Sequence, residues 1–179
     1  MVVTMILIIR CKVSKFVEKM IEYKSFTDFP RGTMYAILKD AYSYDNRNKE
    51  VWDDNWKESD DFFYDNPEIA RKYGLVTCID GNPIGFVTWD PRKQPDYVEI
   101  GHNAIIEKYK GNGYGHMQLE EAINRIKKYP GLKRIIVCTN EKLIAPKNYE
   151  SVGFSLYDRK ENRTESAHNG DYLYYEINL

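Results

Sequence analysis

The sequence of 179 residues predicts one α/β domain built on a mixed, mostly antiparallel sheet that is flanked by helices. Two observations predict this class. A hairpin pattern occupies the middle of the chain, and an amphipathic helix later joins two apolar strands. A hairpin gives an antiparallel strand pair, whereas a strand–helix–strand crossover gives a parallel pair. A chain of this length buries roughly 70% of its unfolded surface, which suffices for a core without disulfides.

The first segment stays unassigned. Residues 1–19 show no clear period, and we interpret them as an N-terminal extension, although an extra edge strand or a leading helix fits them equally well. Met20–Lys24 alternates like a half-buried strand. One domain is therefore expected over residues 20–179.

Three helices are expected before the hairpin. The first covers Thr33–Ala41 with Thr33 as its cap, and the second covers Lys49–Ser59. The buried stripe of the second helix is expected to hold Val51, Trp52, Asn55 and Trp56. Asn66-Pro67-Glu68 reads as a cap, a proline at the first helical position and an acidic first turn, which predicts a short helix to about Tyr73.

The remaining elements alternate between strands and helices. The expected strands are Leu75–Ile79, Ile84–Trp89, Tyr97–Ile106, Leu132–Cys138, Ser155–Arg159 and Tyr172–Ile177. Asp80–Pro83 forms the hairpin turn. One helix carries Leu119, Ala122, Ile123 and Ile126 at helical spacing. A short helix is expected over Pro146–Val152, ending at Gly153.

Composition excludes several classes of protein. Lysine and arginine number 26 against 27 acidic residues, a net charge of -1 that gives no signature of nucleic-acid binding. Cys11, Cys78 and Cys138 match neither a metal-ligand spacing nor a disulfide framework, so we expect no metal site and a reduced, cytoplasmic protein. The longest apolar run, Val2–Ile9, is too short to span a membrane and lacks the basic start of a signal peptide.

A glycine-rich segment, Lys110–Gly115, stands between an expected strand and the amphipathic helix. There, backbone N–H groups can point at an anion, aided by the helix dipole. His116 and Met117 break the P-loop pattern, and His116 and Gln118 replace the last glycine of the dinucleotide pattern. A strand-to-helix turn without a ligand is the alternative.

The segment resembles the acetyl-CoA loop of the GNAT superfamily of N-acetyltransferases, Q/R-x-x-G-x-G/A. Here the loop is Lys110-x-x-Gly113-x-Gly115, with lysine in place of the usual glutamine or arginine. Val98–Ile105 is similar to the family's fourth strand, and Tyr149–Phe154 resembles its Y-E-x-x-G-F signature. The resemblance covers roughly residues 21–179, and its specific part lies between residues 99 and 154.

The resemblance implies a parallel strand pair splayed around acetyl-CoA, and direct transfer of the acetyl group to an amine. The loop would grip the pyrophosphate, and a β-strand N–H would polarise the thioester carbonyl. The cofactor-binding residues implied are Asn103, Ala104, Ile105, Lys110, Gly111, Asn112, Gly113, Tyr114, Gly115, His116 and Asn140.

Two residues are candidates for proton transfer. Tyr149 is the candidate acid, because tyrosine is protonated at working pH and can donate to the leaving thiolate. Glu99 is the candidate base that relieves an ammonium of its proton. Strand alternation puts Glu99, Gly101 and Asn103 on one face and His102 on the other, unless a bulge intervenes. The alternatives are a packing tyrosine and a solvated glutamate.

The acceptor side is expected before the hairpin. Residues 40–68 hold ten acidic and three basic side chains, a net charge of -7 that leaves +6 on the rest of the chain. Five aromatic residues lie in the same stretch: Trp52, Trp56, Phe62, Phe63 and Tyr64. An acidic, aromatic lip suits a cationic amine. Core tryptophans and a solvated helix face are the plainer interpretation.

Three functions fit the sequence. The first is an N-acetyltransferase acting on a small-molecule or protein amine. The second is a non-catalytic acyl-CoA-binding module that senses or regulates. The third, a nucleotide-binding protein, is disfavoured by the failed loop patterns. The acceptor, the acyl chain length and a homodimeric state stay open.

Overall fold

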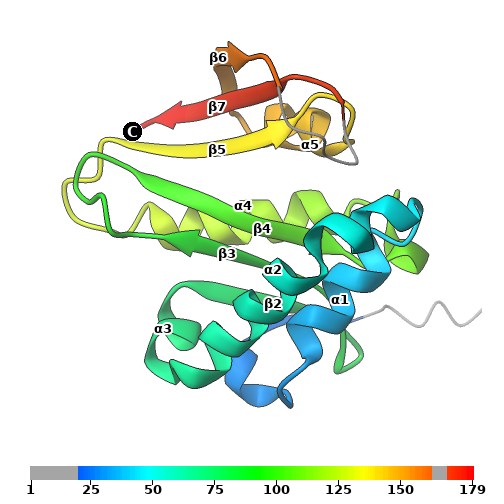
Figure 1. The fold of residues 1–179 in the computed structure, drawn as a ribbon. Helices are drawn as coiled ribbons and strands as arrows, with labels where there is room; N and C mark the ends of the chain where they lie inside the picture. The colour runs from blue at the N-terminus through cyan, green and yellow to red at the C-terminus, as the bar shows by residue number, and fades with distance from the viewer. Residues whose placement is uncertain (1–19, 163–168) are drawn as a thin grey trace, which may run out of the picture.

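A single sheet of seven strands runs through the described part of the chain, residues 20–162 and 169–179, in this computed structural model (Figure 1). The strand order is β1-β2-β3-β4-β5-β7-β6. Only β4 and β5 are parallel, and every other neighbouring pair is antiparallel. The predicted mixed sheet is therefore confirmed. The predicted extension, residues 1–19, lies outside the described residues.

The strands follow the predicted order with small shifts at their ends. They are β1 (Ile21–Lys24), β2 (Gly74–Ile79), β3 (Asn82–Asp90), β4 (Val98–Ile105), β5 (Arg134–Asn140), β6 (Ser155–Lys160) and β7 (Tyr172–Asn178). The helices are α1 (Thr33–Ala41), α2 (Asn46–Asp65), α3 (Pro67–Lys72), α4 (Tyr114–Ile126) and α5 (Ala145–Ser151). Two short 3₁₀ helices are η1 (Phe26–Asp28) and η2 (Glu107–Tyr109).

Helix α1 has the predicted bounds, but Thr33 is not its cap. Gly32 holds the cap position with a φ of 94°, and the Thr33 hydroxyl donates to the carbonyl of Pro30 at 2.7 Å. The carboxylate of Asp60, in α2, accepts from the N–H groups of Gly32 and Tyr35 at 2.8 and 3.1 Å. The cap is thus a buried side chain from another helix, which local sequence does not reveal.

Helix α2 has 20 residues, more than predicted, because the Asp45 side chain caps it at the Arg47 N–H (3.0 Å). The predicted stripe is wrong except for Trp56, which is 3% exposed. Val51 and Trp52 are 46% and 37% exposed, and Asn55 is also exposed. The buried side chains of α2 are Asn48, Trp56 and Asp60.

The predicted start of α3 is only partly right. Pro67 takes the first helical position as expected. The side chain of Asn66 does not cap α3, however, but donates back to the carbonyl of Phe62 in α2 at 2.8 Å. Asn66 therefore closes one helix at the point where the next begins.

Each face of the sheet carries its own apolar cluster. On one face α4 covers the centre of the sheet, and on the other α1, α2 and α3 cover the N-terminal strands (Figure 1). The α4 side buries Leu119, Ala122, Ile123 and Ile126, the predicted stripe. On the opposite face Trp56 packs in a cluster with residues of α1 and β3. Burial on both faces fixes the strands of the centre, whose ends carry the site.

The parallel pair is short. β4 and β5 pair only over Val98–Ile100 and Ile135–Val137, and the two strands separate beyond that point (Figure 1). Helix α4 makes the crossover between them. The second half of β4 is therefore bonded to β3 on one side only.

A bulge in β4 changes the predicted faces. Trp89 pairs with Ile100 and Val87 with Asn103, so Gly101 and His102 together lie opposite Thr88. The partners of Glu99 and Asn103 are three residues apart on β3, which puts these two side chains on opposite faces. The expectation that Glu99, Gly101 and Asn103 share a face is wrong for this reason. His102 instead lies on the side of α2, where its ring meets Ser59 and Phe86.

No helix in residues 20–162 and 169–179 is both long enough and apolar enough to cross a membrane.

Candidate active site

The separation of β4 from β5 opens beside a cavity of about 680 Å³. Its walls come from the end of α1, the end of β4, the glycine loop with the start of α4, and the segment that leads from β5 into α5. Eight of the predicted cofactor-binding residues line it: Asn103, Ala104, Ile105, Lys110, Gly111, Gly113, Gly115 and His116. Residues far apart in the sequence thus meet on one concave surface.

The glycine loop reaches α4 through two left-handed residues. Gly111 and Gly113 have φ values of 74° and 82°, which L side chains rarely adopt. The side chain of Asn112 does not line the cavity but holds the loop, donating to the carbonyls of Tyr109 (3.2 Å) and Lys110 (2.9 Å). No side chain caps the start of α4 at Gly113. The first N–H groups of this helix therefore lie at the cavity wall without a side-chain cap.

The side chains of Lys110 and His116 flank this loop. The ammonium of Lys110 donates to the carbonyl of Ala41 and to Glu107 (2.6 Å), so it ties the loop to the end of α1. The ring of His116 contacts the hydroxyl of Ser151 through Nδ1 at 2.8 Å. Tyr114 does not line the cavity, and its ring packs against Tyr109. Lysine at position 110 therefore braces the loop while it lines the cavity.

Tyr149 is the buried residue of α5. Its side chain is 4% exposed, and burial raises its pKa above the ordinary value for tyrosine. Tyr42 and the thiol of Cys138 add to this rise in pKa, whereas the nearby Asn103 side chain opposes it. Tyr42, at the end of α1, lines the cavity, and burial raises its pKa to about 12. Two protonated phenols thus lie beside the strand opening.

Glu99 lies apart from this cavity. It lines a second, smaller cavity of about 310 Å³ together with Asp90, Arg92, Lys93 and Tyr97. Burial raises the pKa of the Glu99 carboxyl, and the nearby Asp90 adds to the effect. Four residues separate it from Asn103, roughly 13 Å along a strand.

His102 occupies the bulge next to Asn103. Its Nε2 lies 3.2 Å from the Ser59 hydroxyl of α2, and its backbone N–H donates to the Thr88 hydroxyl at 3.1 Å. Burial lowers the pKa of His102, which keeps the ring neutral and able to accept a proton. The bulge therefore brings a second proton acceptor closer to Asn103 than Glu99 is.

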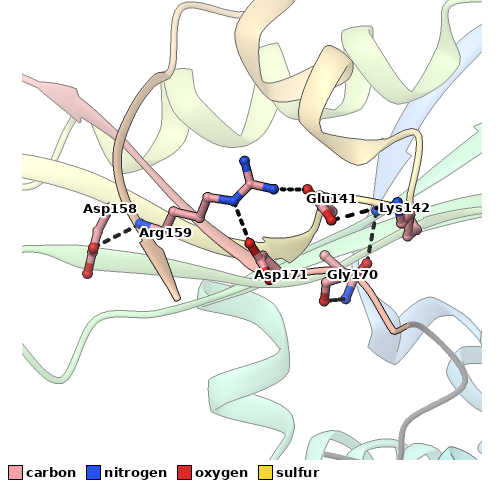
Figure 2. Close-up of polar contacts among 7 residues, drawn as sticks. Glu141, Lys142, Asp158, Arg159, Gly170 and Asp171 are labelled. Carbon is pink, nitrogen blue, oxygen red and sulfur yellow. Dashed lines mark hydrogen bonds and ion pairs between the residues drawn. The ribbon is translucent and has the colours of Figure 1, made fainter. Parts of the chain in front are cut away.

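Asn140 does not line the cavity and has a bracing position instead. Its amide donates to the carbonyl of Gly170 at 2.7 Å and accepts from the N–H of Lys142 at 2.9 Å. Figure 2 shows the adjoining ionic cluster, in which Arg159 reaches Glu141 and Asp171. Together these bonds hold the segment that continues as Lys142–Ala145, one wall of the cavity.

Within the described residues no group of three or more histidine, cysteine and acidic side chains could hold a metal ion. The walls of the cavity combine backbone, aromatic and apolar groups with polar and charged side chains, among them Lys110, Lys142 and Lys147. The site therefore has the character of a slot for an elongated organic ligand with an anionic end at the glycine loop.

Comparison with known families decides the interpretation. The sequence model of the acetyltransferase (GNAT) family matches residues 32–154. The chain belongs to the GNAT family. As a GNAT acetyltransferase it uses acetyl-CoA as cosubstrate, and the glycine loop lies inside the matched region. A comparison with curated proteins gave no match.

Solved structures share the GNAT fold at low sequence identity. The ribosomal-protein-S18-alanine N-acetyltransferase of Escherichia coli is 20% identical with a TM-score of 0.66, covering 89% of this chain and 94% of that one. A Bacillus subtilis acetyltransferase in complex with CoA is 17% identical with a TM-score of 0.59, covering 90% and 99%. The yncA protein of Salmonella typhimurium, with its cofactor acetyl-CoA, is 15% identical with a TM-score of 0.67, covering 90% and 94%.

Most carboxylates of the acidic segment, residues 40–68, pair with other groups of the same domain. Arg31 pairs with Asp61 and Asp65, and Lys57 pairs with Asp53, which also accepts from the Tyr35 hydroxyl at 2.7 Å. Asp45 and Asp60 serve as helix caps. Most of these carboxylates therefore have structural partners, whereas the plainer interpretation expected solvated ones, and of the two tryptophans that it placed in the core only Trp56 is buried.

Two kinds of site residue escape prediction in this GNAT chain. Tyr42 follows a predicted helix at apolar spacing, so sequence reasoning treats it as a packing residue. Gln118 lies on the buried stripe of α4 and is 0% exposed. A polar residue on an apolar helix face was the available signal, because buried amides need partners.

Proposed function

We propose that this GNAT domain transfers the acetyl group of acetyl-CoA directly to a primary amine of a small molecule or a protein. One observation carries the proposal. The uncapped start of α4 lines the cavity beside the place where β4 leaves β5, and the buried phenol of Tyr149 adjoins two residues of its wall, Tyr42 and Asn103. An anion grip and a proton donor at the two ends of one slot are what thioester aminolysis requires.

The residues take the following roles. The N–H groups of Gly111–Gly115 bind the pyrophosphate, with the helix dipole of α4 adding to their attraction. The backbone of β4 over Asn103–Ile105 polarises the thioester carbonyl. The hydroxyl of Tyr149 then gives its proton to the departing thiolate. Its raised pKa keeps it protonated before that step.

His102 is the base that the geometry favours. It is neutral, adjacent to Asn103 and on the side of α2, which belongs to the segment where the acceptor side is expected. Glu99 is more distant and would act only through water. Replacing each residue separates the two assignments: His102→Gln should lower kcat strongly at pH 7 and Glu99→Gln only weakly. The reverse order would return the role to Glu99.

The proposed acceptor is an amine. The acidic segment, residues 40–68, is not proposed to make the enzyme prefer cationic acceptors. Asp53 already pairs with Lys57 and Tyr35, whereas Asp54 is 95% exposed. Asp54→Asn is therefore the informative change. An unchanged KM for polyamine and lysine-type acceptors is expected, and a KM that rises for these amines alone would restore the acidic lip.

The test is thiol release from acetyl-CoA over a panel of small amines and peptide N-termini, in the wild type and in Tyr149→Phe. Acid catalysis of this kind contributes on the order of 10²–10⁴-fold, so Tyr149→Phe should lose most of kcat with little change in the KM for acetyl-CoA. Tight CoA binding without turnover on any acceptor would favour the sensing module instead.

A further inference from the structure

The smaller cavity, of about 310 Å³, shares no lining residue with the larger one. Its walls come from the end of β3, the connection to β4 and the start of β4: Asp90, Arg92, Lys93, Tyr97 and Glu99. The volume lies at the lower end of the range for small-molecule sites. The residues to which we assign acetyl transfer all lie elsewhere. The smaller cavity is therefore open to a ligand of its own.

Contacts within the protein give this cavity a fixed frame. The guanidinium Nε of Arg92 donates to both carboxylate oxygens of Asp90, at 2.9 and 2.8 Å. The backbone N–H of Tyr97 donates to the carbonyl of Lys93 at 3.1 Å and so closes the connection between β3 and β4. Arg134, from β5, lies over the Tyr97 ring at 5.6 Å. The walls therefore hold their positions without a ligand.

Two side chains of opposite charge line this cavity without a partner. Among the residues that the structure describes, neither the ammonium of Lys93 nor the carboxylate of Glu99 forms a hydrogen bond or an ion pair. Arg92 does not serve Glu99, because it is held by Asp90. Glu99 is only partly exposed, and burial raises the pKa of its carboxyl. A partly buried charge that lacks a partner lowers stability.

The two signs together restrict the chemistry of a ligand. A simple amine would pair with Glu99 and leave Lys93 unpaired. A simple anion would do the reverse and would meet repulsion from Glu99. No group of three or more metal-ligating side chains occurs in residues 20–162 and 169–179, so a metal ion does not fit either. A small molecule that carries both an ammonium and a carboxylate satisfies both side chains.

We propose that this cavity binds a small amino acid, whose ammonium contacts Glu99 and whose carboxylate contacts Lys93. Because the two cavities share no residue, the amino acid and acetyl-CoA occupy separate sites. The inference goes beyond the acetyl transfer proposed above and does not depend on it.

The experiment is calorimetric titration of the full chain with glycine, β-alanine, glutamate and lysine. Each amino acid is compared with its N-acetyl derivative, which lacks the ammonium, and with its methyl ester, which lacks the carboxylate. At least one amino acid should bind with a Kd below about 10 mM. Blocking either group should weaken binding about tenfold or more, because each removes a hydrogen bond to a charged side chain.

Glu99→Gln and Lys93→Met should each weaken binding of the amino acid by about the same factor. Glu58→Gln and Lys72→Met are the matched controls, since they remove the same charges from exposed positions outside the cavity and should leave the affinity unchanged. Titration with CoA tests the fold of all four variants, which should bind CoA as the wild type does.

Three results would overturn the proposal. The first is that no amino acid of the panel binds. The second is that a blocked derivative or a simple diamine binds as tightly as the free amino acid. The third is that Glu99→Gln or Lys93→Met binds the amino acid as the wild type does while it also binds CoA normally. Each of these results leaves acetyl transfer intact, because no acceptor and no turnover enter the measurement.

Discussion

Replacing Gly113 with alanine isolates the contribution of the glycine loop. Gly113 has a φ of 82°, and an added Cβ would meet no atom within 4 Å. The cost to folding is thus backbone strain alone, about 1–2 kcal/mol. For a domain of this size that corresponds to a fall in Tm of roughly 2–8 °C.

The same backbone strain should also weaken the binding of acetyl-CoA. Because Gly113 begins α4, relaxing its φ re-aims the N–H groups of the first turn. Loss of one hydrogen bond to a charged group costs about 1.5–3 kcal/mol. The KM for acetyl-CoA should therefore rise about 10- to 100-fold. Steady-state kinetics with varied acetyl-CoA, together with calorimetric titration of CoA, measures both quantities.

Gly81→Ala is the matched control. Gly81 has a φ of 79° and equally open surroundings, but it lies in the β2–β3 turn and not at the cavity. The two variants should lose similar stability, and only Gly113→Ala should lose affinity for CoA. Equal KM values in the two variants would refute the role of the loop backbone.

Three further changes test other parts of the structure. Arg159→Met breaks the contacts with Glu141 and Asp171, so it should cost at most about 1 kcal/mol of unfolding free energy. It should nevertheless raise the KM for acetyl-CoA several-fold, because it loosens the cavity wall. Arg92→Met, which breaks an exposed ion pair, is the control and should leave this KM unchanged. Burial lowers the pKa of His102, so the wild type should lose stability as the pH falls below about 6.5, where the unfolded chain binds the proton more readily. In thermal melts, His102→Gln should therefore show a smaller fall in stability between about pH 7.5 and 5.5 than the wild type. Trp56→Ala should cost about 3–5 kcal/mol in urea denaturation and Trp52→Ala under about 1 kcal/mol, and equal costs would contradict the burial of α2.

Elements with strong local signals could be predicted from the sequence. The stripe of α4 and the bounds of α1 follow from spacing, and the single parallel pair follows from one crossover. Helix α2 shows the limit of that reasoning. Its aromatic residues suggest a stripe, yet Trp56 alone among them is fully buried, and Phe63 packs partly buried against Phe26. Which aromatic residue is buried depends on tertiary contacts.

The site was predictable in its backbone and not in its side-chain geometry. Glycines mark the loop because only they hold its left-handed turns, so the loop could be placed. The bulge in β4 has no local signal, and one inserted residue exchanged the faces of Asn103 and His102 relative to Glu99. Lys110 was expected to bind pyrophosphate, and in the structure its ammonium pairs with Glu107 across η2.

The three-residue ladder between β4 and β5 has a mechanical consequence. It joins a four-stranded half of the sheet to a three-stranded half, whereas β3–β4 and β5–β7 pair over five and seven residue pairs. The short β4–β5 pairing resists twisting less than the longer strand pairs do. Rocking of the two halves of the sheet relative to each other is therefore its softest internal motion. That motion widens or narrows the space beside Asn103, and hydrogen exchange at the seam should report when the slot is filled.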